Sequence, residues 1–313
     1  MPTPLRLGSY SIVKPIGVGA SSNVYLAISD KTFASVAIKQ LRSERLSAPY
    51  RALLANEVAI AANFQHKNIV RQIDADLREV SGPYLVLEYL KGESLDHHQN
   101  TDNLLPINTV LAVIEQVAQA LQYVAQQGVV HRDVKPENII MLPNGLVKLM
   151  DFGCAINSGA ASKMVAGSLA YMSPEQLEGV PLDERADIYS LGATLYRLLT
   201  GKNTFTADNP FDARIAVLNF PATPIQKYRQ ELPANLTAVV HKALQKEVSL
   251  RYANWAEFIA AFGNAAHEVR MSVQDFDVYR GFTTHTQSAI YDQLSASRQF
   301  SRSGFSRSAM PGE

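Results

Sequence analysis

The residues from His131 to Asn138 combine side chains that could transfer a phosphoryl group. This run, HRDVKPEN, contains a carboxylate at Asp133, a cation at Lys135 and an amide at Asn138, and a second carboxylate follows at Asp151. Transfer of phosphate from ATP to a hydroxyl needs a base that orients the hydroxyl, a cation near the moving phosphate and oxygen ligands for Mg²⁺. These residues supply all of these groups within a short stretch of chain.

A second set of residues, near the N-terminus, has the pattern of a phosphate-binding loop. Gly17 and Gly19 precede Val24, and the run Val36-Ala37-Ile38-Lys39 follows on a predicted strand. Glycines let backbone amides approach negative oxygens closely. Alone, the glycines fit an ordinary strand turn and the lysine an ordinary surface residue. Their succession, with strand character on both sides, favours a nucleotide site.

Hydrophobic periodicity predicts the elements that must position these residues. Short runs of β-branched and apolar residues between turn formers predict strands, and apolar residues at intervals of three and four predict helices. Asn144-Gly145 predicts a hairpin turn, and Gly128 and Gly201 are expected to end two long helices. The predicted strands are 10–16, 24–28, 35–41, 69–76, 83–88, 139–141 and 147–150, and the predicted helices are 50–63, 110–124, 188–199, 236–246 and 254–262.

These motifs resemble those of the eukaryotic-type serine/threonine protein kinases. The small catalytic domain with its short activation segment resembles the bacterial members of that family. The resemblance covers roughly residues 10–265 and includes Lys135, which marks the serine/threonine branch. It implies an α+β fold of two lobes. Residues 10–90 are expected to form a five-stranded antiparallel sheet with one helix, and residues 91–265 a larger, mainly helical lobe. The third glycine of the family's loop is replaced here by Ser22.

The resemblance implies a role for each residue of the site, with ATP and Mg²⁺ as cofactors. The implied catalytic residues are Asp133 as base, with Lys135 and Lys39 beside the phosphates, and the implied Mg²⁺ ligands are Asn138 and Asp151. Protein serine or threonine hydroxyls are the implied acceptors. The implied nucleotide-binding residues are Ile16, Gly17, Gly19, Val24, Ala37, Lys39, Glu57, Leu87, Glu88, Leu90, Asn138 and Asp151.

In the family, a helix glutamate pairs with the lysine that corresponds to Lys39. Glu57 lies on the predicted helix, whereas Glu44 falls in a polar stretch before Pro49, so we expect Glu57 to be the partner. By the same resemblance, backbone groups of Glu88 and Leu90 are expected to bond the adenine edge. The apolar residues Val24, Ala37 and Leu87 are expected around the ring, although ordinary core packing would give the same pattern.

Three further positions are expected to support the site. Glu175, in the triplet Ser-Pro-Glu where the family usually has Ala-Pro-Glu, is expected to pair with Arg251. Asp187 is expected to hold the backbone of the catalytic loop. The hydroxyl of Ser168 is expected to bridge Asp133 and Lys135.

The activation segment, residues 151–175, offers three hydroxyls for regulatory phosphorylation, at Ser158, Ser162 and Ser168. We favour Ser162, and a segment that is active without modification fits nearly as well. The tail, 266–313, is rich in Ser, Thr and Gln, and such a composition favours disorder or partial docking. Its FSRS repeat suggests an autophosphorylation region, and an inert tail is an equal alternative.

Composition excludes several other classes of protein. The chain has 313 residues with 29 basic and 29 acidic side chains, so it has no general attraction to nucleic acid or anionic membranes. Its single cysteine, Cys154, excludes an internal disulfide, and no segment has the apolar length of a signal peptide or membrane span. We therefore expect a soluble, cytoplasmic protein, with its oligomeric state open.

Two rival functions remain. The first is a pseudokinase, a scaffold or nucleotide-binding module that keeps the fold without catalysis. Such proteins typically lose residues equivalent to Lys39, Asp133, Asn138 or Asp151, and all four are present here. The second, a small-molecule kinase, is disfavoured by the Ser-Pro-Glu triplet and Asp187. The sequence therefore favours an active protein kinase, and leaves its natural substrate and activating signal open.

Overall fold

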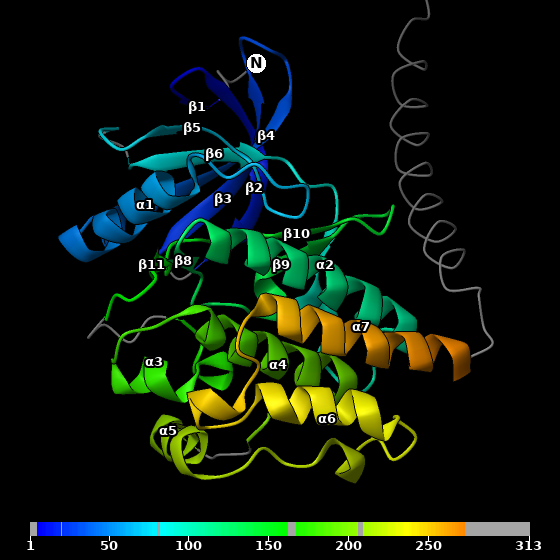
Figure 1. Cartoon of the computed structure of the whole chain (residues 1–313). Coiled ribbons are helices and arrows are strands. Elements are labelled where there is room, and N and C mark those ends of the chain that lie inside the picture. The colour runs from blue at the N-terminus through cyan, green and yellow to red at the C-terminus, as the bar shows by residue number, and fades with distance from the viewer. Residues whose placement is uncertain (1–4, 20, 80–81, 162–166, 206–208, 273–313) are drawn as a thin grey trace, which may run out of the picture. The chain divides into compact units, whose positions relative to one another are not determined.

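The computed structural model describes residues 5–19, 21–79, 82–161, 167–205 and 209–272 (Figure 1). These residues belong to one compact unit that has an N-terminal sheet lobe and a helical C-terminal lobe. The α+β fold predicted from the sequence is confirmed. Ser162 and the tail beyond residue 272 lie outside the described residues, and the expectations for them stay predictions.

The N-terminal lobe is an antiparallel sheet with helix α1 (Ala48–Ala61) packed against it (Figure 1). Its strand order is β1-β2-β3-β4-β6-β5, so the five predicted strands are joined by an additional edge strand, β1. A strand of two residues is too short to show alternation, which is why the sequence pattern missed it. The strands are β1 (Arg6–Leu7), β2 (Tyr10–Val18), β3 (Ser22–Ser29), β4 (Ser35–Leu41), β5 (Gln72–Asp76) and β6 (Tyr84–Glu88).

Strand β4 shows how the sheet separates core from site. Val36 and Ile38 point into a buried cluster of the lobe, and are 2% and 0% exposed. Because successive side chains of a strand alternate between faces, Ala37 and Lys39 lie on the opposite face, where both are half-buried. One face of β4 therefore anchors the sheet, and the other presents residues predicted to bind nucleotide.

The strand predicted at residues 69–76 begins later than expected, at Gln72. Ile69 instead forms a parallel bridge with Leu149 of β10 (Val147–Leu149), and the N–H of Val70 donates to the Leu149 carbonyl at 2.9 Å. The apolar residues before β5 thus join the two lobes, a pairing that local periodicity does not reveal.

The C-terminal lobe is built around helix α4, which is buried along most of its length (Figure 1). Gly128 and Gly201 follow α2 and α4 with φ of +71° and +69°, as expected of residues that end a helix. The helices are α2 (Ile107–Gln126), α3 (Pro174–Glu178), α4 (Glu184–Thr200), α5 (Pro210–Asn219), α6 (Ala234–Ala243) and α7 (Trp255–Ser272). The other short strands are β7 (Glu93–Ser94), β8 (Val129–Val130), β9 (Ile139–Met141) and β11 (Ile156–Asn157).

Three helices differ most from the sequence prediction. α3 has five residues, too few for periodicity, and α5 buries Val217 but leaves Phe211 70% exposed, so neither shows an apolar stripe. α7 continues past the predicted end at residue 262, and Ala266 and Val269 on it are buried in the core. The predicted domain boundary at residue 265 therefore falls inside a packed helix. Within the described ranges, no helix has both the length and the apolar content needed to cross a bilayer.

Candidate active site

Lys39 links the sheet to the predicted metal-binding motif. Its Nζ lies 2.8 Å from Oε2 of Glu57 on α1 and 2.8 Å from Oδ1 of Asp151. The Glu57 side chain is 4% exposed, so the ion pair is buried. The alternative partner, Glu44, has a 61% exposed side chain and pairs with Arg42 instead. The structure thus contains the pair expected from helix position.

The two carboxylates around Lys39 have different environments. Burial raises the pKa of Glu57 to about 7, although the charge of Lys39 lowers it. Burial also raises the pKa of Asp151, but Lys39 and the Gly153 amide outweigh burial and hold the pKa at about 2. Burial lowers the pKa of Lys39, and the two carboxylates raise it above its usual value. Asp151 is therefore ionised at neutral pH, and its 39% exposed side chain can accept a cation.

The catalytic loop gathers Asp133, Lys135 and Asn138. Oδ2 of Asp133 lies 2.7 Å from Nζ of Lys135, and Nδ2 of Asn138 donates to the same oxygen at 3.0 Å and to the Asp133 carbonyl at 2.8 Å. Because the Asn138 amide nitrogen is engaged with Asp133, its oxygen is the atom suited to a metal. The N–H of Met150 donates to the Asn138 carbonyl at 2.9 Å, which joins this loop to the Asp151 motif.

Ser168 contacts the same pair in a way that differs in part from the prediction. Its Oγ accepts a hydrogen bond from Nζ of Lys135 at 2.7 Å, as expected. The contact to Asp133 is made by the Ser168 backbone, whose N–H donates to Oδ1 at 2.9 Å. The contact with Asp133 therefore does not depend on the side chain of residue 168.

The backbone of the catalytic loop is fixed by Asp187 of α4. This carboxylate is 2% exposed and accepts hydrogen bonds from the N–H groups of His131 and Arg132, at 2.7 and 2.8 Å. Arg132 has φ of +70°, a left-handed conformation that is unfavourable for a residue other than glycine. The buried acceptor holds this backbone in place, as the sequence analysis expected.

The residues that follow Asp151 pack against the N-terminal lobe. Phe152 is 1% exposed, and its ring makes edge contacts with Phe64 and His131, with centroids 5.1 and 4.7 Å apart. Asn56 of α1 donates from Nδ2 to the carbonyl of Ala155 at 2.8 Å. Sequence analysis missed Asn56, because an asparagine on a helix carries no signal of a distant partner.

The residues predicted to enclose the nucleotide lie on neighbouring strands. Gly17 is opposite Val24 across β2 and β3, and Ala37 is opposite Leu87 across β4 and β6. The N–H of Gly19 donates to the carbonyl of Ser22 at 2.7 Å and closes the glycine turn between β2 and β3. Residue 20 of this turn lies outside the described residues. Ile16, at the edge of this group, is 40% exposed.

Comparison with known proteins shows the family to which this chain belongs. The sequence model of the protein kinase domain matches residues 10–261. The chain belongs to the protein kinase family. It is 36% identical over 271 residues to the serine/threonine-protein kinase PknB of Mycobacterium tuberculosis, a match that covers 83% of this chain and 43% of the relative. A probable PknB of Bifidobacterium longum is 34% identical over 273 residues, covering 82% and 40% of the two chains.

A third relative, a probable serine/threonine-protein kinase of Clostridium acetobutylicum, is 30% identical over 272 residues, 85% of this chain and 41% of its own. The chain therefore spans less than half the length of these bacterial relatives. Protein kinase domains in general use ATP with Mg²⁺ and act on protein substrates.

The hinge, the segment from Glu88 at the end of β6 to Leu90, contains a partly buried ion pair that sequence analysis missed. Oε1 of Glu88 lies 2.6 Å from Nζ of Lys148 on β10, and Lys148 also donates to the Ile69 carbonyl at 3.1 Å. The N–H of Glu88 donates to the Arg71 carbonyl at 3.0 Å, so any adenine contact by this residue falls to its carbonyl. Leu90, which follows β6, is half-buried. The sequence signal that could have indicated this pair is Lys148 itself, a single lysine between two apolar residues of a strand.

Glu175 and Arg251 form the expected pair of the kinase fold. The two side chains make parallel hydrogen bonds of 2.6 and 2.7 Å and are 9% and 0% exposed. Of the predicted phosphorylation sites in the described segment, Ser158 is exposed, whereas the hydroxyl of Ser168 is engaged by Lys135.

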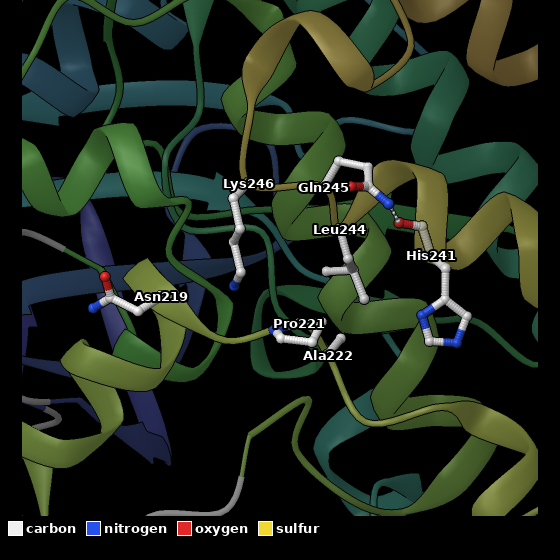
Figure 2. A pocket seen from close by; sticks show the side chains of 7 residues that line it. All are labelled: Asn219, Pro221, Ala222, His241, Leu244, Gln245 and Lys246. Carbon is white, nitrogen blue, oxygen red and sulfur yellow. Dashed lines mark hydrogen bonds between the residues drawn. The ribbon is translucent and has the colours of Figure 1, made fainter.

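A cavity of about 220 Å³ lies elsewhere in the C-terminal lobe (Figure 2). Burial lowers the pKa of Lys246 at its edge to about 8, and the nearby charge of Arg251 adds to this effect. None of its lining residues is a predicted site residue, so it is separate from the catalytic cluster. They are Asn219, Pro221, Ala222, His241, Leu244, Gln245 and Lys246.

Proposed function

We propose that this chain is an ATP- and Mg²⁺-dependent serine/threonine protein kinase that also phosphorylates itself. The observation that carries the proposal is the linked cluster of four side chains: Lys39 contacts Asp151, and Asn138 contacts Asp133. The Met150–Asn138 backbone hydrogen bond joins the two contacts. Family membership and the identity to serine/threonine kinases support the same reaction.

In this proposal, Asp133 accepts a hydrogen bond from the substrate hydroxyl and takes up its proton as the phosphate is transferred. Lys135, 2.7 Å from Asp133, supplies positive charge beside the moving phosphoryl group. Asn138 and Asp151 would hold Mg²⁺ through oxygen atoms, and the metal supplies charge neutralisation of the phosphates when bound. Lys39 would bind the nucleotide phosphates while Glu57 keeps its ammonium group in place.

The proposed acceptor is a serine or threonine of a protein. Lys135 is the residue that marks this branch of the family, and Ser168 fixes its Nζ beside Asp133. The Ser-Pro-Glu triplet and the Asp187 support are features of protein kinases, and small-molecule kinases generally lack them. These features favour a protein substrate and do not identify it.

Transfer of labelled phosphate from ATP, to a generic basic protein and to the chain itself, tests the proposal. We expect Asp133→Asn to lower the rate by ~10²–10⁴-fold, the usual contribution of a positioned acid–base group. Glu44→Gln, which changes an exposed glutamate outside the cluster, should leave the rate unchanged. A wild-type chain that binds ATP but transfers no phosphate would instead support a pseudokinase.

A further inference from the structure

The peptide unit between Arg132 and Asp133 is held at both of its polar atoms. Its carbonyl oxygen accepts a hydrogen bond from Nε2 of Gln176 at 2.9 Å, and its N–H donates to Nδ1 of His131 at 3.3 Å. Because a peptide unit is planar, the two bonds together set its orientation. That orientation in turn sets the direction in which the Asp133 carboxylate leaves the backbone.

This orientation depends on the strained backbone of Arg132. Its φ of +70° is sparsely populated by residues with a side chain, and such conformations persist where the surroundings enforce them. The N–H of Arg132 donates to Asp187 at 2.8 Å, and the carbonyl of Arg132 accepts a hydrogen bond from Gln176. The backbone of Arg132 is therefore held on both sides of its Cα. Loss of the Gln176 amide would let the peptide rotate and relieve the strain.

Gln176 is a rigid support for this carbonyl. It is 3% exposed and lies on α3, where its own N–H donates to the Ser173 side chain at 3.4 Å. Its neighbour Glu175 makes the paired hydrogen bonds to Arg251, which fasten α3 to the body of the lobe. The amide donor is therefore carried by a helix that cannot shift easily.

The activation segment packs against the same group. Gly167 has φ of +113°, and a Cβ at this position would stand 2.8 Å from the Arg132 carbonyl and 3.3 Å from both Oδ1 of Asp133 and Nε2 of Gln176. The N–H of Ser168 then reaches Oδ1 of Asp133 at 2.9 Å. Gln176 thus lies where the end of the activation segment, the strained peptide and the catalytic carboxylate all meet.

We propose that Gln176 is a positioning residue for phosphoryl transfer, whose side-chain amide orients the Arg132–Asp133 peptide and so directs the Asp133 carboxylate to the substrate hydroxyl. The inference rests on the proposed kinase activity. Gln176 acts through the backbone, and the nucleotide contacts proposed above do not involve it. Its loss therefore lowers kcat and leaves the KM for ATP unchanged.

The first test compares Gln176→Met with Gln116→Met in the full chain. Methionine keeps the length of the side chain but donates no hydrogen bond. Gln116 is a matched control, because its Nε2 donates to the Gly145 carbonyl at 2.9 Å, away from the catalytic loop. We expect Gln176→Met to lower kcat by about 10–100-fold, the range for a misplaced catalytic group, with the KM for ATP within about threefold. At temperatures where the variant is folded, Gln116→Met should have the same kcat as the wild type.

A second variant, Gln176→Glu, gives a pH signature that a merely structural role would not produce. An ionised carboxylate would face the Arg132 carbonyl as a second acceptor, whereas a protonated one could donate to it. Burial raises the pKa of such an acid, so its protonation falls within a measurable range. The ratio of kcat for Gln176→Glu to kcat for Gln176→Met should rise as the pH falls from about 8 to about 6.

Hydrogen–deuterium exchange of the catalytic loop tests the positioning independently of turnover. The amides of Arg132 and Asp133 should exchange at least about tenfold faster in Gln176→Met than in the wild type, and should not change in Gln116→Met. Equal kcat for the two methionine variants would overturn the inference. If the wild type itself transfers no phosphate, the proposed function fails, and unchanged exchange at these two amides would then overturn the positioning role separately.

Discussion

Removal of the Asp187 carboxylate tests how far the catalytic loop depends on a single buried acceptor. Its two oxygens receive the backbone N–H groups of His131 and Arg132, and the second of these residues is held with φ of +70°. In Asp187→Ala both N–H groups lose their partner inside the core. The strained backbone then has no restraint on its amide side, so stability and turnover should fall together.

The size of the effect follows from these contacts. Each buried N–H left without a partner costs about 1–3 kcal/mol, which gives roughly 2–6 kcal/mol for the pair. Burial raises the pKa of Asp187, because a buried charge is costly. The alanine variant no longer has this cost, which offsets part of the lost stability. We therefore expect a net loss of about 3 kcal/mol. For a domain of this size the unfolding temperature should fall by roughly 6–12 °C.

Thermal unfolding and kcat at a temperature well below unfolding are the two measurements. Asp183→Ala is the matched control, because Asp183 caps the same helix by accepting the Arg185 N–H at 2.9 Å and does not contact the catalytic loop. Its loss should cost ~1 kcal/mol and leave kcat unchanged. An Asp187→Ala variant that unfolds within about 2 °C of the wild type, or that keeps at least half of its kcat, would contradict this role of Asp187.

Three further predictions concern the ion pairs. Lys39→Met should reduce phosphate transfer by at least ~10²-fold while the far-ultraviolet circular dichroism spectrum is retained, and an undiminished rate would exclude its role. The raised pKa of Glu57, about 7 when folded against 4.5, means that the folded protein keeps a proton that the unfolded chain releases. Stability of the nucleotide-free protein should therefore fall as the pH rises from 4.5 to 7, by about 3 kcal/mol. Glu57→Gln should flatten this slope in denaturant titrations and Glu44→Gln should not. Glu175→Ala should cost about 3–5 kcal/mol, because Arg251 keeps a buried charge without its carboxylate, and a loss below about 1 kcal/mol in urea unfolding would contradict this.

The sequence predicted those parts of the site that are written as local motifs. The Lys39–Glu57 and Glu175–Arg251 pairs were expected because each member lies in a run that resembles a motif of the kinase family. Asp187 was expected for the same reason, because the run that it begins matches a helix of the kinase family. The role of a residue in such a motif can be predicted because the residues next to it in the sequence identify the motif.

The contacts that sequence reasoning missed join residues without such a context. Lys148 meets Glu88 across 60 positions, and Asn56 reaches Ala155 across 99. Gln176 follows a recognised triplet, yet a polar residue on a five-residue helix gives no sign that it turns toward Arg132. Only the packed fold determines which distant backbone group each of these side chains meets.

β10 is attached both to the segment before β5 and to Glu88 at the end of β6. The N–H of Val70 donates to the Leu149 carbonyl, and Glu88 pairs with Lys148, so these segments form a seam that opens only if the partly buried ion pair breaks. The seam lies at the β5–β6 end of the sheet, and β1 and β2 lie at the other end. A rotation of the sheet about this joined edge would therefore displace the turn between β2 and β3 more than it displaces β5 and β6.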